Sequence, residues 1–323
     1  MNRITSLQLL SLMLLSSVWE LVCLRQIPGS GAILGAICAY LLQFALLIPL
    51  LSTDITPVQS RAAGIAYAAY FLLAGARNLS QLSHAAPQSL LSVPGKLAGL
   101  VLLFVTCLYT AASGIRAAAR CAPMTLGVLA LATVVLIAGA WGRTVPERFY
   151  WSQEGFSEGM GVFFTASELP ALWVLRGRLR GSPRRMLMRY TLLRAGVTAL
   201  LIYLSIAADG RLLGLRDYPF FTLTALSQPL AGQRADALYI LVFVMLCVMQ
   251  LTLQAGLCAH VLEEAFAFRR HTAPAVLLGM LLLAGVMPPD MLTALTGMLT
   301  PILAFGLPCT ILLLRRMGRR VRV

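Results

Sequence analysis

The hydrophobic positions of this 323-residue chain fall into long runs, and polar residues gather in the short segments between them. A run of about 20 apolar residues is the length that an α-helix needs to cross a bilayer. We therefore predict ten transmembrane helices, at 7–24, 30–51, 62–82, 96–114, 122–141, 156–174, 189–208, 235–258, 273–287 and 291–314. Because the longest connecting segment covers only about residues 209–234, we expect one all-α membrane domain over 1–323.

The composition agrees with this pattern. The chain is 59% hydrophobic and 12% charged, whereas soluble domains carry about 25% charged residues. The net charge of +14 would also suit a nucleic-acid-binding protein. The arginines, however, lie mostly in short loops between apolar runs, where they set the orientation of the helices. We therefore expect membrane lipid around the chain and no nucleic acid as a partner.

The loop charges predict the orientation. With ten crossings, every second loop lies on the same side as both termini. That side collects 17 of the 26 basic residues, and the other side collects 7. Since cytoplasmic loops carry the excess of Lys and Arg, we expect both termini in the cytoplasm. The six arginines within 176–189 should attract anionic headgroups.

Motifs for catalysis and for metal binding are missing from the sequence. There is no His, Cys and Glu cluster at metal spacing, no glycine-rich phosphate loop and no Gly-x-Ser-x-Gly turn. The seven cysteines lie in apolar runs and show no disulfide framework. We therefore expect no enzyme activity, no catalytic residue, no metal and no cofactor.

Four ionisable residues fall inside the predicted helices: Glu20, Arg77, Glu168 and Arg194. Charged groups at membrane depth are costly unless they are paired, so they mark functional or pairing sites. Counted from the cytoplasmic ends of their helices, Glu168 and Arg194 lie at similar depth, and we predict that they form an ion pair. Such a pair either fixes helix register or takes part in ligand or proton coupling.

The sixth predicted helix holds the most concentrated set of unusual residues: Gly155, Glu158, Gly159, Gly161, Phe163, Phe164, Ser167, Glu168 and Pro170. Glycine and proline weaken a helix. An interrupted helix near the bilayer centre can present backbone N–H groups to a carboxylate and carbonyl groups to a cation, which suits an amino acid. The alternative is that Gly155 and Gly159 form a packing face and that Pro170 is a tolerated kink.

The first and eighth predicted helices each contain polar residues with two possible roles. If the fold consists of two inverted halves, the first helix should be interrupted as well, yet 7–24 contains no glycine or proline. Trp19 beside Glu20 is either an anchor at the membrane interface or a pocket wall. In the eighth helix, Gln250, Thr252 and Gln254 either line a polar path or form interhelical hydrogen bonds.

Four segments resemble one known family. Residues 4–8 (Ile-Thr-Ser-Leu-Gln) look like the family opening Ile-Ser-x-x-Gln, and 77–87 are similar to its end of the third helix. Residues 113–120 resemble its Gly-x-x-x-x-x-Arg end of the fourth helix. The longest match starts at Tyr218-Pro219 and continues through Arg234-Ala235-Asp236 into the eighth helix. This family is the spore germination permeases, the membrane-embedded B subunits of nutrient germinant receptors.

The resemblance implies a fold like that of amino acid–polyamine–organocation transporters, with ten helices in two inverted five-helix repeats. It also implies a small nutrient ligand such as an amino acid, and partner A and C subunits in the inner membrane of a spore, or the plasma membrane. The family's transporters usually carry a Gly-x-Gly-like break in the first helix, where this chain has Ser-Ser-Val-Trp-Glu at 16–20. Gln233 also stands where the family often has Glu.

The resemblance and the intramembrane charges together give a set of candidate residues. Candidates for ligand binding are Trp19, Glu20, Arg77, Tyr109, Glu158, Gly159, Gly161, Phe163 and Glu168. Arg120, Pro219 and Arg234 are expected to be architectural. The leading hypothesis is a nutrient-sensing receptor subunit. The alternatives are an amino acid or organic cation transporter coupled to protons or Na⁺, and a degenerate scaffold that only assembles a complex.

Overall fold

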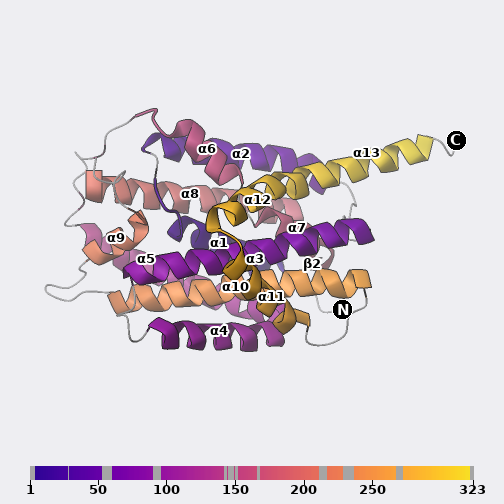
Figure 1. Cartoon of the computed structure of the whole chain (residues 1–323). Helices are drawn as coiled ribbons and strands as arrows, with labels where there is room; N and C mark the ends of the chain where they lie inside the picture. Colours follow the sequence, from indigo (N-terminus) through magenta and orange to yellow (C-terminus); the bar gives the residue numbers. More distant parts are fainter. Residues whose placement is uncertain are drawn as a thin grey trace.

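The computed structural model describes residues 4–27, 29–52, 60–89, 96–141, 144, 149, 152–165, 168–210, 217–227, 236–266 and 272–320. Helices occupy all ten predicted ranges (Figure 1). Eight ranges hold one helix each: α1 (Ser6–Val22), α2 (Gly31–Leu51), α3 (Arg61–Ser89), α4 (Lys96–Ser113), α5 (Ile115–Trp141), α8 (Pro183–Asp209), α10 (Asp236–Phe266) and α11 (Thr272–Val286).

The other two ranges are divided. The sixth consists of α6 (Phe156–Phe164) and α7 (Leu169–Leu175), followed by the short 3₁₀ helix η3 (Arg176–Arg178). The tenth consists of α12 (Pro289–Pro301), the π-helical segment η5 (Ile302–Gly306) and α13 (Leu307–Arg320). A further short helix, α9 (Pro219–Leu226), precedes α10.

Five helical segments in the described part of the chain are long and apolar enough to cross a membrane: α2, α5, α8, α10 and the segment from α12 into α13. Shorter apolar helices accompany them, including α1 and α11. The chain is therefore an all-α integral membrane protein, as the hydrophobic pattern predicts.

Segments that were predicted to share a side of the membrane meet at the same end of the bundle. At one end, β1 (Ile4–Thr5) pairs in parallel with β2 (Leu179–Arg180), a contact that the sequence analysis did not predict. At the other end, the Tyr218 amide donates to the Arg25 carbonyl at 2.8 Å. Strand β1, the first described element, and the end of α13 (Leu307–Arg320) both lie toward the β2 end of the bundle (Figure 1).

Helix α1 lies inside the bundle. It contacts α5, α8 and α10, and most of its residues are buried. A capping box starts it: the Gln8 amide donates to Thr5 Oγ1 at 3.3 Å, and the Thr5 amide donates to Gln8 Oε1 at 3.0 Å. The helix continues to Val22 without interruption, which agrees with its lack of glycine and proline.

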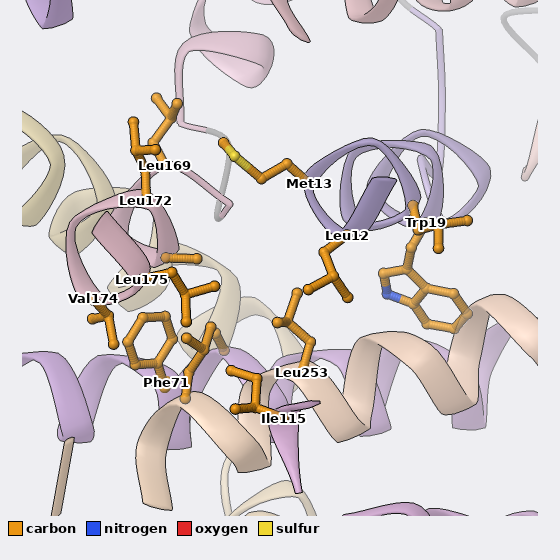
Figure 2. Packing of buried hydrophobic residues seen from close by; sticks show 14 of the residues in the cluster. Leu12, Met13, Trp19, Phe71, Ile115, Leu169, Leu172, Val174, Leu175 and Leu253 are labelled. Carbon is orange, nitrogen blue, oxygen red and sulfur yellow. The ribbon is translucent and has the colours of Figure 1, made fainter. Parts of the chain in front are cut away.

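The largest hydrophobic cluster joins α1 to α7 and α10. Figure 2 shows Met13 of α1 extending toward Leu169 and Leu172 of α7, whereas Leu12 points toward Leu253 of α10. Every residue of α7 from Leu169 to Leu175 is buried. This seven-residue helix therefore lies inside the bundle, unlike the more exposed α6.

The π-helical segment η5 is held by two buried aromatic donors. A π turn leaves carbonyl groups without the usual intrahelical partner. Tyr67 Oη donates to the Leu303 carbonyl at 2.8 Å, and Trp173 Nε1 donates to the Ala304 carbonyl at 2.8 Å. These bonds tie the tenth helical range to α3 and α7.

Candidate functional site

The sixth predicted helix is interrupted, as one of the two sequence interpretations expects. Helix α6 ends at Phe164, and α7 begins at Leu169, directly after Glu168. Pro170 lies in the first turn of α7, where a proline needs no hydrogen-bond partner for its nitrogen. The interruption therefore follows the glycines instead of falling among them, because Gly159 and Gly161 are both helical.

The packing interpretation of the α6 glycines is also correct for Gly159. A Cβ at Gly159 would lie 2.7 Å from the Ala32 Cα, and a Cβ at Gly31 would lie 2.6 Å from the Glu154 carbonyl oxygen. Gly35 in α2 likewise leaves no room for a Cβ against the Phe156 carbonyl. Helices α2 and α6 thus approach at backbone distance, as small residues permit in membranes.

The predicted ion pair between Glu168 and Arg194 is present. Arg194 Nη2 lies 2.8 Å from Glu168 Oε1, and the two side chains are 4% and 0% exposed. Tyr190 Oη, one helical turn before Arg194 in α8, donates to the same carboxylate oxygen. The pair joins the α6–α7 interruption to α8.

Arg194 is further held by α2. Its guanidinium carbon lies 4.0 Å from the ring centre of Tyr40, a cation–π contact, and its Nη1 donates to Gln43 Oε1 at 3.1 Å. Gln43 Nε2 in turn donates to the carbonyls of Phe163 and Phe164 at 3.1 and 2.8 Å. Gln43 therefore satisfies carbonyl groups that the end of α6 leaves without helical partners.

One acceptor and one donor of this ion pair remain unused. Among the described residues, no partner reaches Glu168 Oε2 or Arg194 Nε, although both atoms are buried. Buried polar atoms are nearly always hydrogen-bonded, and an unpaired one costs about 1–3 kcal/mol, more when it is charged. Within the described part of the chain, the site therefore offers one carboxylate oxygen and one guanidinium N–H without a partner.

A second ion pair lies between α1 and α3, where the Arg77 side chain is buried and the Glu20 side chain is 21% exposed. Arg77 Nη2 is paired with Glu20 Oε1, and Arg77 Nη1 lies 3.4 Å from Thr296 Oγ1 of α12. Both residues were candidates for ligand binding, but no sequence pattern indicated that they pair with each other. The pair neutralises two charges that would otherwise be costly at this depth.

Trp19 is not an anchor at the membrane interface, because its side chain is fully buried. Its ring stacks on Phe243 of α10 with centroids 5.3 Å apart, and its Nε1 donates to Asn78 Oδ1 at 3.3 Å. Trp19 therefore packs inside the bundle, and its role as a pocket wall stays a prediction. The indole N–H is satisfied by α3 instead of by lipid headgroups.

Three candidates lie away from these pairs. Tyr109 is 75% exposed, because the buried residues Cys107 and Ala111 on either side of it turn α4 the other way. Glu158 and Gly161 are exposed on α6, since Gly159 faces α2. Tyr109, Glu158 and Gly161 therefore lie away from both ion pairs, and their role in ligand binding stays a prediction. Buried Phe163, by contrast, contacts Tyr40 beside Arg194.

Two of the expected architectural residues are described. Arg120 is exposed in the first half of α5, and Pro219 opens α9 after Tyr218, whose φ of 57° is left-handed. Arg234 lies outside the described residues. An architectural role stays a prediction for all three.

The polar residues of α10 divide between the two alternatives. Thr252 Oγ1 forms an interhelical hydrogen bond of 2.6 Å with Thr110 Oγ1 of α4. By contrast, the two amide atoms of Gln250 and Oε1 of Gln254 are buried and have no partner in the described part of the chain. The interhelical hydrogen bond is confirmed for Thr252, and the polar path stays a prediction for Gln250 and Gln254.

The sequence analysis missed several residues that build the Glu168 site: Tyr40, Gln43, Tyr190 and Thr198. Tyr190 precedes Arg194 by four residues, so the helical period could have placed both on one face. Tyr40 and Gln43 lie far away in the sequence, on α2, and no local pattern brings them to Glu168.

Comparison with known proteins does not assign the chain to a family. No known family profile matches the chain, and a search of curated proteins finds no significant match.

Proposed function

We propose that the chain is the membrane subunit of a nutrient germinant receptor, and that it binds a small zwitterionic nutrient such as an amino acid at the α6–α7 interruption. One observation carries this proposal. The buried Glu168–Arg194 pair keeps one carboxylate oxygen and one guanidinium N–H without a partner among the described residues. An amino acid supplies an ammonium group for the oxygen and a carboxylate for the N–H, so one ligand can satisfy both atoms.

The surrounding residues fit a site for a small ligand more closely than a site for a large one. Glu168 is 1% exposed, and Tyr40, Phe163 and Tyr190 are also buried. A closed site with low water content strengthens the interaction of charges. Binding there can bias the position of α7 relative to α6 and α8, which is how a ligand signals to partner subunits.

The proposed topology is ten crossings in two inverted five-helix repeats, with both termini in the cytoplasm. Helices in all ten ranges, with β1 and the end of α13 at one end of the bundle, support it. Partner A and C subunits and a place in the spore inner membrane follow from the sequence resemblance alone.

A coupled amino acid transporter is the second candidate. Glu168 favours it, because a buried carboxylate inside a membrane bundle can carry a proton or meet a cation. The continuous α1 weighs against it, since transporters of this architecture use interrupted helices in both halves. Receptor function therefore explains the asymmetry between α1 and the α6–α7 pair better than transport does.

Dipicolinate release from spores of the source organism tests the proposal. A strain lacking the gene should lose its response to one nutrient within a panel of amino acids and sugars. Glu168→Gln should raise the nutrient concentration needed for release. Glu158→Gln is the matched control, because Glu158 is an exposed carboxylate of the preceding helix. Because breaking the buried pair also destabilises the fold, immunoblots should measure the amount of each variant in spore membranes, and release should be compared at matched amounts.

Other results would contradict the receptor proposal in distinct ways. Unchanged germination of the deletion strain with every nutrient, together with altered amino acid uptake in growing cells, would establish transport. A germination defect in the deletion strain that neither Glu168→Gln nor Arg194→Gln reproduces would leave a scaffold without a ligand site.

A further inference from the structure

A second interior feature lies apart from both ion pairs. A cavity of about 690 Å³ is lined by residues of α1, α5, α8, α9 and α10. Leu14 and Val18 of α1 form one wall, and Val197 and Leu201 of α8 form another. Glu20, Arg77, Glu168 and Arg194 do not line it. The walls are mostly apolar, so the cavity has a different chemistry from the proposed nutrient site.

The cavity has an open side between α5 and α8. These helices both pack on α1 but touch each other little. Val134 of α5 and Leu200 of α8 line the cavity and are 62% and 38% exposed. Because α5 and α8 are both long and apolar enough to span a membrane, the medium at this opening is lipid hydrocarbon.

The polar lining is concentrated at the α9 end. Asp217, Thr222 and Thr224 line the cavity there, and Asp217 Oδ1 is paired with Arg25 Nε at 3.3 Å. Tyr239, near the start of α10, shares a 3.1 Å hydrogen bond with Ser227 at the end of α9. The cavity is therefore apolar along its length and polar at one end, which is the polarity of a lipid.

We propose that this cavity binds an acyl chain of a membrane phospholipid, with the lipid headgroup at the Arg25–Asp217 end. Its volume lies within the range of about 300–1,000 Å³ that is typical of sites for small ligands. Apolar cavities do not hold water well and accept apolar guests. A lipid chain enters from the surrounding bilayer through the gap between α5 and α8, without unfolding a helix.

The proposal is independent of the nutrient site, and it can be tested with the tryptophans of the chain. Trp19 is fully buried and stacks on Phe243, which lines the cavity. Trp173 is also buried, at 1% exposure, but it lies beside η5 and does not line the cavity. Bulk lipid contacts neither ring, so quenching of Trp19 by a bromine atom on a lipid chain requires the chain to be inside.

The experiment uses two single-tryptophan proteins in nanodiscs. One keeps Trp19 and the other keeps Trp173, with phenylalanine at the remaining tryptophan positions. Nanodiscs of phosphatidylcholine and phosphatidylglycerol are prepared with and without bromine in the middle of the acyl chains. We expect brominated lipid to reduce Trp19 emission more than Trp173 emission. Equal, weak quenching of both would overturn the proposal.

Filling the cavity supplies a matched control. Ala130 and Thr133 of α5 line the cavity, whereas Ala138 of the same helix is exposed and does not. Ala130→Phe combined with Thr133→Phe should abolish the additional quenching of Trp19. Ala138→Phe should leave it unchanged. Additional quenching that survives the filled cavity would contradict the assignment.

Two further experiments test whether the ligand is a soluble apolar molecule and provide an alternative if the tryptophan variants misfold. A brominated alkyl alcohol in nanodiscs of unlabelled lipid tests for a soluble apolar ligand. Quenching by the alcohol but not by the lipid would overturn the lipid assignment. If the tryptophan variants fail to fold, the wild-type chain can be labelled with a phospholipid that carries a mid-chain diazirine. Adducts on Leu14 or Val18 of α1 would support the proposal, because both residues line the cavity and are buried from bulk lipid. Adducts confined to the exposed surfaces of the helices would overturn it.

Discussion

Trp19 stacks on Phe243 while its indole N–H donates to Asn78, so one side chain joins two interior features of the bundle. Phe243 lines the apolar cavity. Asn78 follows Arg77, which is paired with Glu20, the residue after Trp19. Direct contacts therefore connect the wall of the cavity to the neighbourhood of the Glu20–Arg77 pair.

Removing one member of the Glu168–Arg194 pair should destabilise the fold strongly. Glu168→Gln leaves a buried guanidinium without its counter-charge, and Arg194→Gln leaves a buried carboxylate. Breaking a buried pair in this way costs about 3–5 kcal/mol. Maleimide dye labelling during heating measures the effect, because Cys23, Cys107 and Cys247 are buried and react only on unfolding.

The double variant Glu168→Gln, Arg194→Gln distinguishes pairing from two separate effects. It removes both charges, so we expect it to unfold at a higher temperature than either single variant. The exposed pair Arg25–Asp217 is the control. Arg25→Gln should change stability by only about 0–1 kcal/mol, because solvent screens the two charges. Additive losses in the double variant at 168 and 194 would show that the two side chains do not depend on each other.

How much of this site is predictable depends on sequence distance. Glu168 and Arg194 lie on neighbouring helices joined by a short connection, so counting residues from the helix ends places them at one depth. Glu20 and Arg77 lie in the first and third helical ranges, and nothing in the sequence indicates which sides of those helices face each other. The same limit explains why Gln43 was missed.

The helices themselves follow from apolar length, because each run must bury its backbone polar groups in lipid or protein. The exact position of the α6–α7 interruption does not follow from apolar length. Glycine weakens a helix but also lets helices pack closely, and only the position of α2 decides between these effects for Gly159. The exposed face of α4 that carries Tyr109 likewise depends on tertiary packing.

Gly159→Ala should loosen the α2–α6 contact. The added Cβ would lie 2.7 Å from the Ala32 Cα, which is backbone and cannot turn aside. Overpacking of this kind costs about 1–3 kcal/mol. Gly161→Ala, on the same helix, is the matched control, because nothing lies within 4 Å of its Cβ. The alanine there should have no effect or a small stabilising one.

Thermal unfolding of the two alanine variants, followed by cysteine labelling, checks this prediction. Cys38, Cys121 and Cys309 are exposed and must be blocked with unlabelled maleimide before heating. A loss at Gly161 as large as the loss at Gly159 would mean that helix propensity or insertion, and not the contact with Ala32, sets the effect.

Tyr67→Phe should destabilise the tenth helical range. The variant keeps the ring but removes the donor to the Leu303 carbonyl in η5. A buried carbonyl without a partner costs about 1–3 kcal/mol. Tyr203→Phe is the control, because the Tyr203 side chain is 37% exposed at the surface of α8. Hydrogen exchange of residues 302–306 should quicken in the first variant only, and equal exchange in both would contradict a structural role for this bond.

Cysteine accessibility tests the proposed topology. In a cysteine-free chain, Ser182→Cys and Ser30→Cys place single thiols at opposite ends of the bundle, before α8 and before α2. If the termini are cytoplasmic, a membrane-impermeant maleimide added to intact cells should label the thiol at 30, because the α9 end faces outward. The thiol at 182 should react only after the membrane is permeabilised.

Each variant also needs a permeabilised control, since Ser30 itself is buried and bonded to Ser152. Asp217→Cys provides a more exposed second position at the outer end. Labelling at 182 but not at 217 in intact cells would reverse the orientation, and labelling at both would contradict the placement of these positions on opposite sides of the membrane.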